Sequence, residues 1–300
     1  MPKAKSNGIE LEYEIHGDPA AEPLLLVMGL GAQMTRWPPA LYEMLVARGL
    51  RVIRFDNRDV GLSQKIDEAG MPDYPAILTA LAAGQKPPVA YTLSEMAADT
   101  VGLLDTLGIR RAHIVGASMG GMISQLVAAD YPDRVLSLTS IMSTTGNRAL
   151  PQATPEALAV LTNRGPSPKE DREGFIAHSL NSARVIGSPG FPFEEQRLRD
   201  RIVMDLDRCY YPPGFARQYA AVMATPDRRE KLKTITAPTI VLHGDADPLV
   251  NVAGGHDTHA NIPGAELRIF PGMGHDIPQP LYGDIVDGIM RAVERARVTA

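Results

Sequence analysis

Hydrophobic and polar positions follow a regular order along the first half of the chain, and their spacing predicts strands and helices in turn. Residues 9–15 alternate between apolar and polar side chains, which predicts an edge strand with one face in water. Residues 24–28 (LLLVM) are continuously apolar, as is typical of a strand covered on both faces. Residues 38–48 predict a helix with proline in its first turn, and residues 51–55 predict the next strand.

The same order continues through the middle of the chain. Thr92-Leu-Ser-Glu95 is a capping box that predicts a helix extending to about Leu107 with one apolar face. A strand, a helix and a strand are predicted next, at residues 112–117, 120–129 and 135–142. Strands that are apolar on both faces and alternate with helices predict an α/β fold, with a mostly parallel central sheet flanked by helices.

This order breaks between about residues 146 and 229, where the chain is helical in pattern and punctuated by proline. Helix starts are predicted at Thr154-Pro155 and Ser167-Pro168, because proline is tolerated at the first helical position. Strand patterns return at residues 239–243 and 266–270, and an amphipathic helix closes the chain. We therefore expect one α/β core made of residues 1–145 and 230–300, interrupted by a helical insertion at residues 146–229.

Composition and charge exclude several classes of protein. The apolar share of 44% and the charged share of 22% are those of an ordinary globular protein. The net charge of −5 gives no electrostatic basis for binding nucleic acid. The longest nearly apolar stretch, residues 24–32, is far shorter than the ~20 residues that span a bilayer, and no secretory signal is visible. We expect a cytoplasmic protein that binds neither membrane nor nucleic acid; its oligomeric state is left open.

The segment Gly116-Ala-Ser-Met-Gly120 matches the pattern G-x-S-x-G between a predicted strand and a predicted helix. Such a tight turn strains the backbone of the serine and requires small residues two positions to either side. It also exposes the serine hydroxyl above the sheet, beside a helix N-terminus whose dipole favours a developing oxyanion. Ser118 is therefore the candidate nucleophile.

A serine nucleophile needs a base to accept its proton and an acid to orient that base. His275 lies in a glycine-flanked loop after the predicted strand 266–270, at the sheet edge where open α/β sheets bind ligands. Asp245 and Asp247 both follow the predicted strand 239–243, and spacing alone does not separate them. The predicted chain order is serine, acid, histidine.

The other histidines fit the role of base less well. His113 lies inside a predicted strand, and we expect it to be packed or hydrogen-bonded there. His243 ends the strand before the acidic loop, where an indirect supporting role is expected. His256 and His259 have no clear third metal ligand, and Cys209 is the only cysteine, so no metal site is predicted.

In combination, these motifs resemble the α/β-hydrolase superfamily over nearly the whole chain. The matching segments are FDNRDVGLS (55–63), YTLSEMAADTVGLLDTLGI (91–109), HIVGASMGGMISQLVAADYPDRV (113–135), APTIVLHGDADPLV (237–250) and GMGHDIP (272–278). The resemblance implies that the acid is Asp247, three residues after the glycine that closes its strand. It also implies that residues 146–229 form the helical cap that roofs the active site in this family.

The resemblance further implies an oxyanion hole made of two backbone N–H groups, those of Met119 and Leu30. The early loop of the family usually reads His-Gly, whereas this chain has Met28-Gly29, which removes a buried polar side chain that supports the loop. In carrying Met-Gly, the chain is similar to a subset of bacterial esterases that includes methylesterases acting on anthracycline polyketides.

Three aromatic residues are candidates for the substrate pocket. Trp37 is close in sequence to the oxyanion loop, and Tyr210 and Tyr211 lie in the predicted cap. Ordinary packing is the alternative for each of them. The loop Asp56-Asn-Arg-Asp59 is expected to be structural.

The resemblance and the candidate triad together predict a carboxylesterase that cleaves small to medium, mainly apolar esters through an acyl-enzyme. Such chemistry requires no cofactor and no metal. A lactonase, a carbon–carbon bond hydrolase or a perhydrolase could use the same triad. A ligand-binding receptor of the same fold with incidental hydrolysis is the alternative from a different class.

Overall fold

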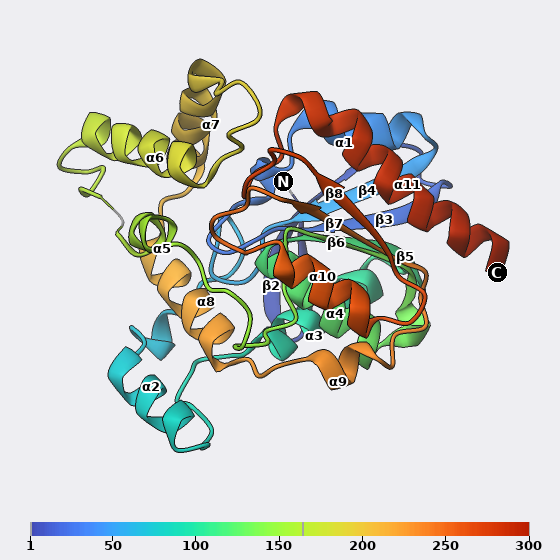
Figure 1. Cartoon of the computed structure of the whole chain (residues 1–300), viewed down its shortest axis with the longest axis horizontal. Helices are drawn as coiled ribbons and strands as arrows, with labels where there is room; N and C mark the ends of the chain where they lie inside the picture. Colours follow the sequence, from blue (N-terminus) through green and yellow to red (C-terminus); the bar gives the residue numbers. More distant parts are fainter. Residues whose placement is uncertain (1, 164, 300) are drawn as a thin grey trace.

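A computed structural model describes residues 2–163 and 165–299 and places an eight-stranded sheet between two layers of helices (Figure 1). The strand order is β1-β2-β4-β3-β5-β6-β7-β8. Strand β2 runs antiparallel to both of its neighbours, and the other neighbouring pairs are parallel. The predicted α/β fold with a mostly parallel sheet is confirmed.

The strands are β1 (Lys3–Ser6), β2 (Ile9–His16), β3 (Glu22–Val27), β4 (Leu50–Phe55), β5 (Ala112–Ala117), β6 (Val135–Ile141), β7 (Thr239–Gly244) and β8 (Glu266–Phe270). The helices before and after residues 146–224 are α1 (Pro39–Ala47), α2 (Tyr74–Ala82), α3 (Leu93–Thr106), α4 (Met119–Asp130), α9 (Arg229–Leu232), α10 (Ala253–Asn261) and α11 (Tyr282–Thr299). The remaining helices are α5 (Pro155–Thr162), α6 (Arg172–Ile186), α7 (Glu195–Arg208) and α8 (Pro212–Ala224).

Helices cover both faces of the sheet, which is why its central strands are apolar throughout. Helices α1 and α11 pack on one face, and α3, α4 and α10 pack on the other (Figure 1). All residues of β5 are buried between these layers. Within the described residues, no helix combines the length and the apolar character needed to cross a bilayer.

The strand predicted at residues 9–15 exists, but the prediction that it lies at the edge of the sheet is wrong. Strand β1 pairs along its outer side, with Lys3 opposite Glu12. Asn7 and Gly8 connect the two strands with φ values of 48° and 82°. Positive φ at both positions is the conformation of the tight hairpin turn that Asn-Gly favours, so this dipeptide was the signal for β1.

One of the two helix starts predicted in the insertion is confirmed. Helix α5 begins at Pro155, where the Thr154 hydroxyl accepts a hydrogen bond from the Ala157 N–H. Ser167-Pro168 starts no helix, because the next one begins at Arg172 after the N-cap Asp171. Between residues 146 and 229 the described chain forms helices and loops without a strand, grouped to one side of the sheet (Figure 1).

Two buried ion pairs fasten this helical segment to the core. Arg217 of α8 donates to both carboxylate oxygens of Asp59 at 2.8 and 2.7 Å. Arg208 of α7 lies 2.7 Å from Asp56. Both aspartates belong to the loop after β4, and their side chains are fully buried. These contacts give the loop at residues 56–59 the structural role expected of it.

Replacing Arg217 with methionine is expected to lower the free energy of unfolding by about 3–5 kcal/mol, because the Asp59 carboxylate would remain buried without its cation. Denaturant unfolding measures this loss. Arg172, which pairs with Asp207 on the exposed surface, is the matched control, and Arg172→Met should change stability by less than about 0.5 kcal/mol. Equal losses in the two variants would contradict the structural role of the buried pair.

His113 is buried in β5, with Nδ1 2.8 Å from the Ser137 hydroxyl and Nε2 3.2 Å from a Glu22 oxygen. Burial lowers the pKa of His113 and outweighs the opposite effect of Glu22. As pH falls below about 6.5, the histidine therefore becomes protonated in the unfolded chain before it does so in the folded protein. Its contribution to the free energy of unfolding, which is fully present above about pH 6.5, is lost as the pH falls toward and through the pKa in the folded state.

We expect the free energy of unfolding of the unmodified protein to fall more steeply than that of His113→Asn between about pH 7 and pH 5. The difference between the two pH curves isolates the contribution of His113. Parallel curves would show that its protonation is not linked to folding.

Candidate active site

Ser118 occupies the turn between β5 and α4, with φ 57° and ψ −121°. The flanking glycines permit this strained conformation. A Cβ atom on Gly116 would lie 2.1 Å from the Gly120 carbonyl oxygen, and one on Gly120 would lie 2.1 Å from the Val27 carbonyl oxygen. The tight turn predicted from the sequence, with its requirement for small neighbours, is confirmed.

Three side chains from separate loops meet at this turn. The Nε2 atom of His275 lies 2.9 Å from the Ser118 hydroxyl, and its Nδ1 atom lies 2.7 Å from an Asp247 oxygen. Asp247 follows β7 and His275 follows β8, so both stand at the carboxyl ends of parallel strands. Asp245 faces elsewhere, because it accepts a hydrogen bond from the Gly272 N–H.

The Asp247 carboxylate is fully buried and has several partners. One oxygen accepts hydrogen bonds from the N–H groups of Leu249 and Val250, at 2.9 and 2.8 Å. The other faces His275 and, at 3.5 Å, His243. Burial acts to raise the pKa of Asp247, but the charges and hydrogen bonds of the two histidines hold that pKa well below its usual value. A carboxylate in this position favours a proton on Nδ1 of His275, which leaves Nε2 free to accept one from Ser118.

Met119 and Leu30 border the same cavity as Ser118 and His275, and we name this space of about 450 Å³ the Ser118 cavity. Met119 begins α4 directly after the serine, and Leu30 lies on the loop after β3. A Cβ atom added to Gly29 would lie 3.1 Å from the Ser118 Cβ. Glycine thus allows this loop to pass directly against the serine.

Two amide side chains support the loop. The Asn57 amide donates to the Met28 carbonyl at 2.9 Å. Gln218 of α8 accepts from the Gly31 N–H at 2.8 Å and donates to the Arg58 carbonyl at 2.7 Å. These contacts supply the polar support that the Met28 side chain cannot give. The sequence analysis expected the loop that contains Asn57 to be structural, but it missed Gln218, which is 187 positions from its partner Gly31.

The helical segment also holds the histidine loop. The His275 N–H donates to the Ile186 carbonyl at 2.7 Å, and the Gly274 N–H donates to the Ser188 hydroxyl at 2.9 Å. A Cβ atom on Gly274 would lie only 2.2 Å from the Gly187 carbonyl oxygen. The chain leaving α6 is therefore packed directly on the loop that carries His275.

Comparison with known proteins agrees with this geometry: the family described as alpha/beta hydrolase fold matches residues 22–278. The chain belongs to this family. It is 27% identical over 299 residues to rhodomycin D methylesterase DnrP of Streptomyces peucetius, covering 94% of each chain. It is 27% identical over 302 residues to rhodomycin D methylesterase DauP of Streptomyces sp. strain C5, again covering 94% of each.

Solved structures give the same fold. A meta-cleavage product hydrolase from Pseudomonas fluorescens IP01 superposes with a TM-score of 0.76 at 19% identity, over 99% of this chain and 98% of the other. A thermophilic esterase from Thermogutta terrifontis superposes with a TM-score of 0.69 at 25% identity, over 98% of each chain.

The three aromatic pocket candidates of this α/β hydrolase do not border the Ser118 cavity. Trp37 is fully buried and packs in the apolar core. Tyr210 and Tyr211 border a separate cavity of about 120 Å³, where Tyr210 packs edge-on against Phe175. Tyr219, one helical turn beyond Phe215 on α8, borders the Ser118 cavity instead. The sequence analysis thus chose tyrosines in the correct part of the helical segment but not the one that borders the Ser118 cavity. The direction of each side chain is set by how the helices pack.

The wall of the Ser118 cavity is mainly apolar, with charged groups from Arg36, Arg201 and Asp276. Burial, together with the charge of Arg36, lowers the pKa of Arg201 to about 10. Burial raises the pKa of Asp276, which accepts a hydrogen bond from the Ser188 hydroxyl. Over residues 2–163 and 165–299, no group of three or more His, Cys, Asp or Glu residues is arranged to hold a metal ion.

Proposed function

We propose that the protein is a carboxylic-ester hydrolase in which Ser118 is the nucleophile, His275 the base and Asp247 the acid. The observation that carries this proposal is the pair of contacts that His275 makes, 2.9 Å to the serine hydroxyl and 2.7 Å to the buried carboxylate. The two methylesterases among its relatives support an ester as the substrate.

In the proposed reaction, the Ser118 oxygen attacks the acyl carbon while His275 takes the hydroxyl proton. The tetrahedral intermediate then collapses, and His275 returns a proton to the departing alcohol. Water, activated by His275, attacks the acyl-enzyme and releases the acid. Asp247 keeps the ring of His275 in the required orientation and stabilises its positive charge.

The N–H groups of Met119 and Leu30 are the proposed donors to the oxyanion. Both residues border the cavity that contains the serine hydroxyl, and the Met119 N–H stands at the start of α4, where the helix dipole favours negative charge. Loss of one such donor commonly costs about 100–1000-fold in rate.

Residues 146–229 are the proposed cap over a core of residues 1–145 and 230–300. The segment contributes Leu158, Ile186 and Tyr219 to the wall of the Ser118 cavity. It also binds the histidine loop through Ile186 and Ser188. A cap that supplies both the apolar wall and part of the support for His275 suits small to medium esters with an apolar body.

Steady-state hydrolysis of 4-nitrophenyl acetate, butyrate and hexanoate by the unmodified protein tests this proposal. We expect sustained release of nitrophenol, with many equivalents per protein molecule. The acyl chain length that gives the highest rate should report the size of the apolar part of the cavity. A single stoichiometric burst, or no release, would contradict an esterase and favour a ligand-binding role. A matched panel of lactones and thioesters separates ester hydrolysis from the related reactions of the same triad.

A further inference from the structure

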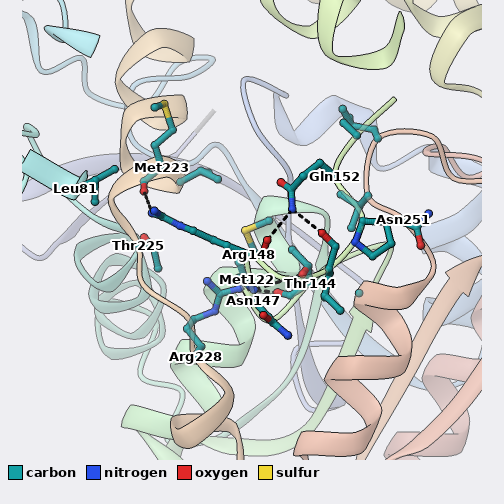
Figure 2. Close-up of a pocket in the computed structure, with 18 of the residues that line it drawn as sticks. Leu81, Met122, Thr144, Asn147, Arg148, Gln152, Met223, Thr225, Arg228 and Asn251 are labelled. Atoms are coloured by element: carbon teal, nitrogen blue, oxygen red, sulfur yellow. Dashed lines mark hydrogen bonds between the residues drawn. The ribbon is translucent and has the colours of Figure 1, made fainter. Parts of the chain in front are cut away.

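A second cavity, of about 350 Å³, is lined by residues shown in Figure 2, and it adjoins the Ser118 cavity. We name it the Arg228 chamber; its polar wall includes Asn147, Arg148, Arg228 and Asn251. The two cavities share a wall, formed by residues that border both of them: Met122, Thr144, Gln152, Ala153, Val222, Leu249 and Val250. A substrate held at Ser118 therefore has the Arg228 chamber as a neighbouring space for its remote part.

The charged residues that line this chamber are positive. Arg148 and Arg228 border it, and none of the described residues in its wall is an aspartate or a glutamate. Asp227, the residue next to Arg228 in sequence, pairs instead with Arg229 at 2.7 Å. The Ser118 cavity differs, because Asp276 stands in its wall together with its arginines.

Arg228 is a buried cation, 3% exposed, whose contacts are with neutral groups. Its Nη2 donates to the Thr144 carbonyl at 2.6 Å, while Nε and Nη2 lie 3.3 Å from the Gln125 side-chain oxygen. Its Nη1 has no hydrogen bond to any residue that the structure describes. Burying this charge is costly, and the nearby Asp227 carboxylate offsets part of that cost; an anion bound in the chamber would offset more of it.

Gly146 leaves this nitrogen uncovered. The glycine has φ +84°, and a Cβ atom built on it would lie 3.0 Å from Arg228 Nη1. Arg148, two residues further on, extends to α8, where its Nη2 donates to the Met223 carbonyl at 3.1 Å (Figure 2). The two guanidinium groups thus supply donors to one chamber from two different segments of chain.

The chamber is also tied to the reacting serine through the loop after β6. The Ser143 hydroxyl donates to the Ser118 carbonyl at 2.8 Å, and the next residue, Thr144, accepts the hydrogen bond from Arg228. This short loop therefore fixes the position of the Arg228 guanidinium relative to Ser118.

We propose that the ester substrate carries a carboxylate on the part that extends away from the scissile bond, and that Arg228 and Arg148 bind this carboxylate in the Arg228 chamber. The inference rests on the proposed function, which places the ester group at Ser118. It specifies in addition that the remote part of the substrate is negatively charged. Guanidinium groups bind carboxylates through strong charge-assisted hydrogen bonds, and an ammonium group in the same place would be repelled.

Matched substrates test the preference in the unmodified protein. The first series pairs 4-nitrophenyl monoesters of straight-chain dicarboxylic acids with 4-nitrophenyl alkanoates of equal length. The second pairs acetate esters of ω-hydroxy carboxylic acids with alkyl acetates, so that the carboxylate lies on the alcohol side. We expect kcat/KM to favour the carboxylate by about 10–100-fold at one chain length in one series, since hydrogen bonds to charged groups are strong. Added salt should reduce this preference, and an amine-ended ester should be the poorest of its series.

Variants assign the preference to the arginines. Arg228→Gln and Arg148→Gln should each lower the ratio of kcat/KM between carboxylate and neutral ester by about tenfold. Arg172→Gln is the matched control, because this exposed arginine pairs with Asp207 and borders neither cavity, and it should leave the ratio unchanged. Arg148 bonds only to a backbone carbonyl, so its variant remains informative if Arg228→Gln does not fold.

A binding measurement separates the failure of this inference from the failure of the proposed function. The Ser118→Ala protein is titrated calorimetrically with monoesters of the dicarboxylic acids and with the corresponding diethyl esters. Tighter binding of the monoester, lost in Ser118→Ala/Arg148→Gln, supports the inference even if the unmodified protein does not turn esters over. Equal binding of monoester and diester at every chain length, or equal kcat/KM in both kinetic series, would overturn it.

Discussion

Replacing Ser118 with alanine should lower kcat for 4-nitrophenyl esters by about 10⁴–10⁶-fold, the range seen when an essential triad member is removed from a serine hydrolase. The substitution removes the oxygen that would form the acyl-enzyme, while the proposed oxyanion donors of Met119 and Leu30 remain. The residual rate therefore reports what binding and those donors contribute by themselves.

Ser124→Ala is the control for this substitution. Ser124 is a buried serine on α4, and its hydroxyl donates to the Gly120 carbonyl at 2.8 Å. We expect this variant to keep its activity within about tenfold, since its hydroxyl contributes one ordinary hydrogen bond. A loss of less than about 100-fold in Ser118→Ala, with the fold retained, would contradict the assignment of the nucleophile.

Replacing Asp247 with asparagine should lower kcat by about 10⁴-fold, because an amide neither stabilises the charged imidazole nor enforces the tautomer that leaves Nε2 free. The buried carboxylate has a strongly lowered pKa, so it is ionised over the whole range in which the enzyme would be assayed. The effect should therefore persist at every pH above about 5.

Asp245→Asn is the matched control, two residues away on the same loop. Its side-chain oxygen can still accept the hydrogen bond from the Gly272 N–H, and it does not contact His275. We expect a change in kcat of less than about tenfold. If Asp245→Asn were the more damaging of the two, the acid would have been assigned to the wrong residue.

The architecture was predictable because the central strands are buried on both faces. Apolar runs such as those at residues 24–28 and 112–117 are typical of strands that are covered on both faces. The structure places these runs in and directly after β3 and in β5. Strand β1 was missed because it has only four residues, and its buried face carries the small side chains of Ala4 and Ser6. Helix α2 was missed as well; it presents only Ile77 as a buried residue.

The contact among Ser118, Asp247 and His275 was predictable for a different reason. Each residue lies in a short loop directly after a strand, and parallel strands bring such loops to one edge of the sheet. The choice between Asp245 and Asp247 required the family resemblance, since both lie on the same loop. Of the two aspartates, Asp247 contacts His275, whereas Asp245 accepts a hydrogen bond from the Gly272 N–H.

The residues around the triad were not predictable, because their contacts are set by how the helical segment packs on the core. Gln218 of α8 contacts the loop that holds Gly31, and the adjacent Arg217 joins α8 to Asp59. Tyr210 and Tyr211, which precede α8, border a different cavity. Sequence patterns predict which face of a helix is apolar, but not which of its neighbours that face meets.

The central claim is that the Ser118 oxygen, activated by His275, forms a covalent bond with the substrate. Treating the protein with a sulfonyl fluoride and locating the adduct by mass spectrometry tests it most directly, because the reagent requires an activated hydroxyl. The claim predicts a single adduct on the peptide that contains Ser118, with loss of activity in proportion to labelling and no adduct in Ser118→Ala. Labelling that inactivates the protein through another residue, or that persists in Ser118→Ala, would contradict it.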